Sequence, residues 1–242
     1  MIEGELALLV NNNFAKPLNE QIRDYSLIPA RLFTTTGTFT PSVTGLYRII
    51  CIGAGGNGGN ATTGGSGNKK GGGAGGVVIG IKRLTQNTVY NVTIGNNASF
   101  GNLMTATAGG DASIVNSEPV PGTGGSGSGD DCQIYDGNDG TNDGGNVGVF
   151  SLGMIGIGGA GFASTGQGGG GGGFGGGGGG RYYYTGSGTT PKGGNGGAGF
   201  GGGQGADEEH SSTLGGGDIN TTANYGYGGD AAVFVEFISE VL

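Results

Sequence analysis

One stretch of the sequence, GGGGGGFGGGGGGRYYYTG at residues 168–186, limits more than any other what this chain can fold into. Glycine has no side chain to bury, and ordering a residue costs about 1–2 kcal/mol of backbone conformational free energy. The chain has 66 glycines among 242 residues, against about 7% in average proteins. Such a run is a disordered linker, a phosphate-binding loop, or an ordered structure held by its own backbone hydrogen bonds.

Backbone order of this kind is possible if extended glycine helices pack side by side. A polyproline II helix has three residues per turn and directs its N–H and C=O groups outward, so neighbouring helices can bond laterally. Glycine must then occupy every inward-facing position, because a Cβ would hold the helices apart. We expect ordered polyglycine II helices, with disorder as the open alternative. The runs concerned are 53–59, 71–76, 158–180, 193–205 and 215–217.

The segments outside the glycine runs predict β-strands. They are rich in Val, Ile, Thr, Tyr and Phe, and several of them alternate partly between apolar and polar residues. No segment has the pattern of a long amphipathic helix. The expected strands are 37–40, 46–53, 76–83, 89–95, 100–107 and 231–238. Because the last strand lies far from the others in sequence, the first and last strands should close one domain. The glycine-rich part then protrudes from it as a long excursion that either has its own order or is disordered.

This pattern predicts a mainly β protein with polyglycine II and little α-helix. The expected domain, residues 34–242, is a small antiparallel β-sandwich-like body with a packed bundle of polyglycine II helices and long loops. Its β-part covers about 34–110 and 225–242, and its glycine helices and loops about 111–224. Residues 1–33 form an N-terminal arm that either packs on this domain or attaches the protein to a larger assembly.

Composition excludes several classes of function. The formal net charge is −8, so the chain lacks the basic surface that nucleic-acid binding needs. Cys51 and Cys132 are too few for a disulfide scaffold, and their pairing stays open. No stretch approaches the roughly 20 apolar residues of a membrane helix. Glu3 and Glu5 stand where a signal peptide carries positive charge, so we expect synthesis and first assembly in a cytoplasm.

Motifs that would carry catalysis or bind a cofactor are weak here. Gly53, Gly55 and Gly58 match the dinucleotide pattern, but the residues that follow cannot begin a stable helix and include no acidic residue at the required spacing. The aspartates between 130 and 143 match neither the EF-hand loop nor the nonapeptide calcium repeat. The single histidine, His210, has no partner in a catalytic motif. We expect no enzymatic activity, no cofactor and no metal.

Polar and aromatic clusters between the glycine runs are candidates for recognition. Consecutive tyrosines supply a large amphipathic contact area at low entropic cost, or alternatively pack over the glycine helices and shield them. The expected contact loops are 57–70, 126–146, 181–192 and 206–214. The candidate contact residues are Arg181, Tyr182, Tyr183, Tyr184, Asp136, Asn138, Asp139, Lys69, Lys70, Glu208 and His210.

The order of these signals resembles the glycine-rich domains of bacteriophage tail fibres and receptor-binding proteins. The resemblance covers roughly residues 34–110 and 225–238. It rests on five segments in their order along the chain, GTFTPSVTGLYRIICIGAGGNGG (37–59), GGAGGVVIGIKRL (72–84), YNVTIG (90–95), SFGNLMTATAGG (99–110) and YGYGGDAAVFVEF (225–237).

The middle of the chain is similar to the tip adhesins of T-even-like phages. That resemblance implies a sandwich of polyglycine II helices whose variable loops at one end bind host surface receptors. The arm 1–33 is much shorter than the fibre-attachment domain of those adhesins. We therefore expect a virion receptor-binding protein at a tail-fibre tip, a monomeric cap or part of a trimer. Its expected partners are a bacterial outer-membrane protein or glycan and, through the arm, other virion proteins. A structural virion cap without receptor binding is the main alternative. An ice-binding protein is a weaker one, because no period-three array of Thr or Ala is present.

Overall fold

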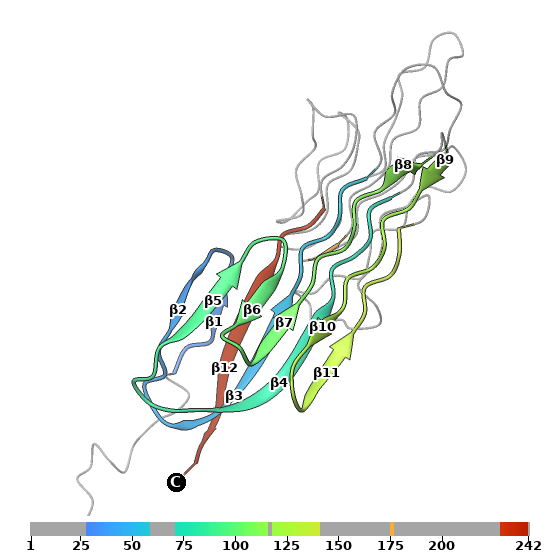
Figure 1. Cartoon of the computed structure of the whole chain (residues 1–242). Helices are drawn as coiled ribbons and strands as arrows, with labels where there is room; N and C mark the ends of the chain where they lie inside the picture. The colour runs from blue at the N-terminus through green and yellow to red at the C-terminus, as the bar shows by residue number, and fades with distance from the viewer. Residues whose placement is uncertain (1–27, 59–70, 116–117, 141–174, 177–227, 242) are drawn as a thin grey trace, which may run out of the picture.

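The protein consists of antiparallel β-sheets that continue into glycine-rich segments (Figure 1). A computed structural model describes residues 28–58, 71–115, 118–140, 175–176 and 228–241. These residues contain no helix, and so none able to cross a membrane. The strands are β1 (Arg31–Phe33), β2 (Gly37–Phe39), β3 (Gly45–Ile52), β4 (Val77–Leu84), β5 (Tyr90–Ile94), β6 (Ala98–Phe100), β7 (Met104–Ala106), β8 (Ser113–Val115), β9 (Glu118–Val120), β10 (Gly127–Ser128), β11 (Cys132–Tyr135) and β12 (Ala232–Glu240).

The larger sheet is built on three long strands. Its order is β1-β12-β3-β4-β11, and every pairing in it is antiparallel. The central strand β3, GLYRIICI, pairs along its full length with both β12 and β4. Its residues alternate between the two faces of the sheet, and six of the eight are buried or β-branched, as a central strand requires.

The second sheet has the order β10-β7-β6-β5-β2 and short strands. Consecutive strands β5, β6 and β7 form a meander. Gly101, in the turn between β6 and β7, has a φ of +55°, which glycine adopts without the steric penalty that a Cβ brings. Residues 127–128 and 132–135 belong to different sheets, so the chain passes from one sheet to the other at Gly129–Asp131.

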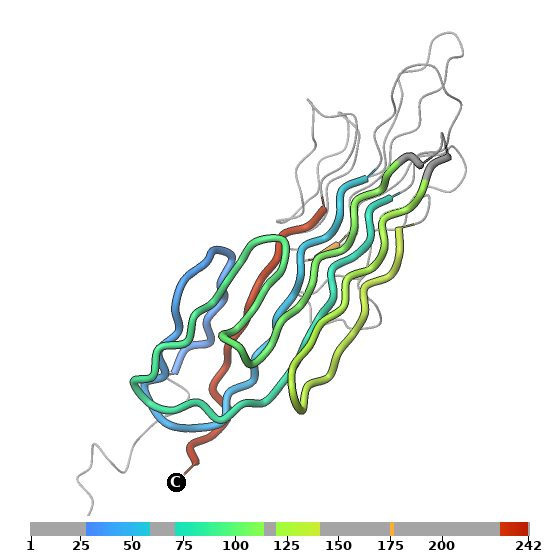
Figure 2. Tube along the Cα trace, in the orientation of Figure 1, coloured from blue at the N-terminus to red at the C-terminus, as the bar shows by residue number. Residues whose placement is uncertain are grey.

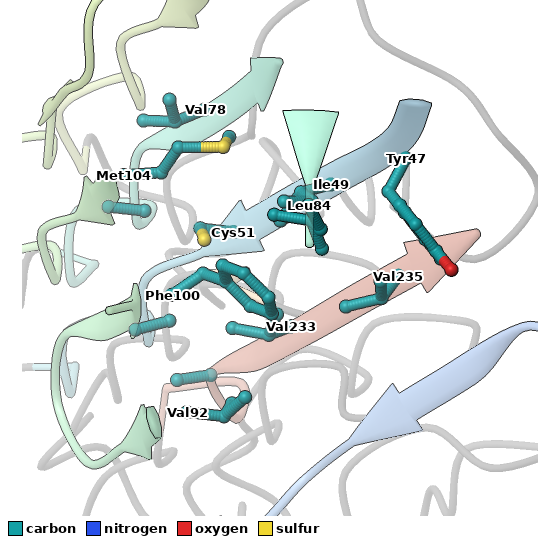
Figure 3. Close-up of a cluster of buried hydrophobic side chains, with 13 residues drawn as sticks. Tyr47, Ile49, Cys51, Val78, Leu84, Val92, Phe100, Met104, Val233 and Val235 are labelled. Atoms are coloured by element: carbon teal, nitrogen blue, oxygen red, sulfur yellow. The ribbon is translucent and has the colours of Figure 1, made fainter. Parts of the chain in front are cut away.

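The hydrophobic core lies between the two sheets (Figure 3). Phe100 from β6 is fully buried and packs near Tyr90 and Phe39 of the same sheet, with ring centroids at 5.4 and 6.0 Å. Tyr47 from β3 contributes a buried ring whose hydroxyl donates to the Val43 carbonyl oxygen at 2.9 Å. The rest of the core is aliphatic or sulfur-containing and includes Ile49, Cys51, Val78, Leu84, Val92, Met104, Val233 and Val235.

The cysteines do not pair. Cys51 is completely buried in this core, and Cys132 is half-buried at its edge; both are free thiols. Burial, and next the nearby Cys132 thiol, raises the pKa of Cys51 to about 12 from an ordinary value of 9.0. Cys51 is therefore a neutral core side chain at physiological pH.

Most of the expected strands are confirmed to within a residue or two, and the mainly β class with them. The expectation of one strand over 100–107 is wrong, because the turn at Gly101 divides this stretch between β6 and β7. Residues 31–33, at the end of the expected arm, form β1 and pair with β12 in the larger sheet. The remaining unforeseen strands are β8 to β11.

Candidate functional site

Six glycine-rich segments leave the two sheets at the same end (Figure 2). We call them the glycine array; they are residues 53–58, 71–76, 107–112, 121–126, 136–140 and 228–230. Each one adjoins a strand in sequence, namely β3, β4, β7, β10, β11 and β12 respectively, with Ala231 between 228–230 and β12. The array therefore inherits the two layers of the sheets, and its segments run side by side away from the core.

Hydrogen bonds within the array repeat every three residues. In the 71–76 segment, Gly73 and Gly76 both donate their N–H groups to the 107–112 segment, at 2.9 Å each. The two amides between them donate elsewhere, Ala74 to Asn138 O at 3.0 Å and Gly75 to Gly175 O at 2.7 Å. Consecutive residues thus point to different neighbours, and every third residue returns to the same one.

Glycine is required in the array because there is no room for a Cβ. A Cβ on Gly75 would lie 2.0 Å from the Gly53 carbonyl oxygen, and one on Gly72 would lie 2.0 Å from that of Gly56. On the opposite side, a Cβ on Gly73 would lie 2.0 Å from the Thr123 carbonyl oxygen. None of these glycines has a left-handed φ. Close approach of neighbouring backbones, and not an unusual conformation, therefore explains the glycine content here.

The 71–76 segment is the centre of the array. Every residue in it is buried. Its neighbours include 53–58, 107–112, 121–126 and 136–140, each linked to it by at least one backbone hydrogen bond or by a glycine contact. The methyl group of Ala74 instead joins a second apolar cluster, on the outer face of the larger sheet, with Ile50, Ile52 and Val77. The array is thus packed and bonded on several sides.

The segments end close together at the distal end, away from the sheets. Gly122 donates its N–H to Gly71 O at 3.1 Å, Gly140 packs against the same carbonyl, and Ala112 donates to Asn57 O at 2.8 Å. The hairpin of β8 and β9 continues from 107–112 and 121–126 at this end (Figure 1). The chain between 58 and 71, and the chain after 140, start from here.

Three of the candidate contact residues lie in the array. Asp139 Oδ1 accepts the N–H of Gly124 at 2.7 Å, and Asp136 Oδ1 accepts the hydroxyl of Ser126. Both carboxylates therefore hold the 136–140 segment to the 121–126 segment, although both side chains are exposed. Asn138 is exposed as well, and its backbone carbonyl accepts from Ala74. The structure brings these three residues together on one short segment.

The expectation of a single contact loop over 126–146 is wrong across 127–135. These residues form β10 and β11 and the turn between them, because β11 pairs with β4 along its whole length. The other candidates lie outside the described residues: Arg181, Tyr182, Tyr183, Tyr184, Lys69, Lys70, Glu208 and His210. So do the loops 181–192 and 206–214 and the glycine runs 193–205 and 215–217.

Two residues of the opening glycine run, Gly175 and Gly176, are described, and both bond to the array. Gly175 accepts from Gly75 and donates to Asp230 O at 2.9 Å, and Gly176 accepts from Gly229 at 2.6 Å. Gly175 and Gly176 therefore bond to segments of the array that adjoin strands of the larger sheet. The rest of the run lies outside the described residues.

Sequence reasoning missed the polar residues that bond the array, Asn57, Asn97 and Asp111. Asp111 Oδ1 accepts the N–H of Asn57 at 2.7 Å, and Asn97 Oδ1 accepts that of Ala108 at 2.9 Å. The signal was an Asn or Asp at the border of a glycine cluster, a pattern that also marks turns. Among the described residues, no group of His, Cys, Asp and Glu is arranged to hold a metal ion. Comparison with models of known protein families and with curated proteins gives no match to this chain.

Proposed function

We propose that the segments of the glycine array are polyglycine II helices packed on a β-sandwich. Three observations support this. Hydrogen bonds recur every three residues, which is the repeat of this helix. They run between segments and not within them. Glycine stands wherever a neighbouring backbone approaches too closely for a Cβ.

We propose that the protein is a phage virion receptor-binding protein, an adhesin at the tip of a tail fibre. The observation that carries this proposal is the common distal end of the array. Segments that continue strands of both sheets end together there, so a bonded backbone scaffold supports several connecting stretches at one end of the molecule. Binding residues are typically found on such loops, held by a rigid scaffold.

The receptor in this proposal is a bacterial surface protein or glycan, contacted through the distal stretches. The aromatic cluster Tyr182–Tyr184 is the main contact candidate, with Lys69 and Lys70, which immediately precede Gly71 at the distal end. Asn138 stays a candidate because its exposed side chain is not engaged in the bonds that hold Asp136 and Asp139. The N-terminal arm joins the protein to other virion proteins.

The test is competition for adsorption. Host bacteria are pre-incubated with the purified protein, and attachment of the phage that encodes it is then counted. The test variant replaces Tyr182, Tyr183 and Tyr184 by serine. The control is Asp130→Ala, in the β10–β11 turn at the opposite end of the strands from the array. We expect the wild-type protein and the control to block attachment, and the tyrosine variant to lose most of the effect.

The other outcomes assign the function differently. If all three folded proteins block attachment, the adhesin proposal stands and another distal stretch carries the contact. If none blocks attachment and none binds the cells, the adhesin proposal is wrong, and a virion cap without receptor binding takes its place.

A further inference from the structure

At the outer side of the glycine array, side-chain oxygens accept hydrogen bonds from backbone amides. Inside the array, backbone N–H groups donate to backbone carbonyls of the next segment. Five amides of the array donate instead to a side-chain oxygen. Ser126 donates to Thr107 Oγ1 at 2.7 Å, and Gly228 donates to Asn57 Oδ1 at 3.0 Å. The other three bonds run from Asn57 to Asp111 Oδ1, from Ala108 to Asn97 Oδ1 and from Gly124 to Asp139 Oδ1, at 2.7, 2.9 and 2.7 Å. The carboxylates of Asp111 and Asp139 are exposed, whereas the central 71–76 segment is buried.

The period of three explains why Asn57 needs a side-chain acceptor. Ala54 and Asn57 are three residues apart and so direct their N–H groups the same way. Ala54 finds the Asn96 carbonyl, in the turn between β5 and β6, at 2.8 Å. That turn does not continue alongside the array, and three residues further on the acceptor is the Asp111 carboxylate. A side chain thus takes the place of a backbone carbonyl from one more segment.

Asp139 does the same at the border formed by the 121–126 and 136–140 segments. Gly137 and Gly140 bond these two segments through backbone groups, donating to Gly125 and Gly122 at 2.8 and 2.7 Å. The amide of Gly124 donates to the Asp139 carboxylate and not to a backbone carbonyl. Without the carboxylate, this border would present a free N–H group to which a further glycine segment could bond.

We propose that Asp111 and Asp139 are edge caps that keep the array of one molecule from pairing with the array of a second copy of this chain. A glycine array that ends with free N–H groups is a template for another such segment, as an exposed β-edge is for another strand. Each carboxylate occupies one such N–H group, so no acceptor from a second copy can bond to it. This proposal concerns self-association and does not depend on receptor binding.

The test separates the acceptor from the charge. Asp111→Ala with Asp139→Ala removes both acceptors, while Asp111→Asn with Asp139→Asn removes the charges but keeps a carbonyl oxygen. A third protein, Asp130→Ala with Asp131→Asn, loses the same two charges in the β10–β11 turn, where asparagine tolerates the positive φ of Asp131. Sedimentation velocity over a concentration series reads the association state of each protein against the wild type.

We expect only the alanine pair to associate beyond the wild type, with a dissociation constant lower by about tenfold or more. If the asparagine pair associates equally, the carboxylates act by charge and the capping proposal is overturned. If the folded alanine pair keeps the wild-type state at every concentration, the proposal is overturned too.

The single variant Asp139→Ala keeps the proposal testable if the double variant does not fold. Its readout is hydrogen exchange at the Gly124 amide. We expect fast exchange in dilute solution and slower exchange as the protein concentration rises, since a second copy then supplies the acceptor. Exchange that is fast at every concentration contradicts the proposal.

Discussion

Replacing Gly75 by alanine places a methyl group where the backbone of a neighbouring segment already lies. The new Cβ would be 2.0 Å from the Gly53 carbonyl oxygen and 2.7 Å from that of Ala54, whereas real Cβ contacts are essentially never under 3.0 Å. The 71–76 and 53–58 segments must therefore separate by about 1 Å. Such a shift breaks the two backbone hydrogen bonds between them, which now measure 2.9 and 2.8 Å.

The expected loss of unfolding free energy is large for one methyl group. Two buried hydrogen bonds are worth roughly 1–1.5 kcal/mol each, and overpacking adds about 1–3 kcal/mol. Reduced freedom of the unfolded chain returns only about 0.4–1 kcal/mol. Gly75→Ala should thus destabilise the protein by about 3–5 kcal/mol.

Urea unfolding followed by tyrosine fluorescence and circular dichroism measures this difference. The matched control is Gly95→Ala, because a Cβ at Gly95 meets nothing within 4 Å. We expect the control to stay within about 0.5 kcal/mol of the wild type. If Gly75→Ala is as stable as Gly95→Ala, the close packing of the array is refuted as the reason for glycine.

Three further predictions test the core. Cys51 should contribute its full share of the unfolding free energy below pH 9. This contribution should fall by about 1.4 kcal/mol per pH unit between pH 9 and pH 12, because the folded state holds the Cys51 proton more tightly than the unfolded state does. Cys51→Val should lack that part of the slope in the same titration. A thiol reagent should modify Cys132 in the native protein and Cys51 only in urea; fast reaction of both would contradict the burial of Cys51. Phe100→Ala should lose about 3–5 kcal/mol in urea unfolding, against less than about 0.5 kcal/mol for the exposed Val89→Ala.

The sheets were predictable to the extent that strand signals are local. β3, β4 and β12 are long and rich in β-branched and aromatic residues, and they were found almost in full. β11, CQIY, is four residues among aspartates and glycines, and its strand state comes from pairing with β4, which lies far away in sequence. The turn at Gly101 was missed although Gly101 and Asn102 form a pair that is typical of hairpin turns. The strand-forming residues on both sides favoured one continuous strand.

The array could be expected as a type of structure but not as an arrangement. The glycine content indicated that backbone hydrogen bonds must hold these segments together. The sequence carried no information on which segment lies beside which. The contacts that decide this join residues such as Gly53 and Gly76, or Gly73 and Gly110, and depend on the order of strands in the sheets. For the same reason the sequence did not reveal that Asp136 and Asp139 accept hydrogen bonds from the 121–126 segment. Their contact with a receptor stays a prediction.

The direction of the array's hydrogen bonds has a mechanical consequence. The bonds lie across the segments, and the segments continue without interruption into β3, β4 and β12. A force that stretches the molecule between the distal end of the array and the core therefore loads many of these bonds at once in shear. It does not break them one after another. Tension enters the longest strands of the larger sheet, where the ladders between β12, β3 and β4 share it over eight or nine residues each. A molecule built this way resists tension best along the axis of the array and of the long strands.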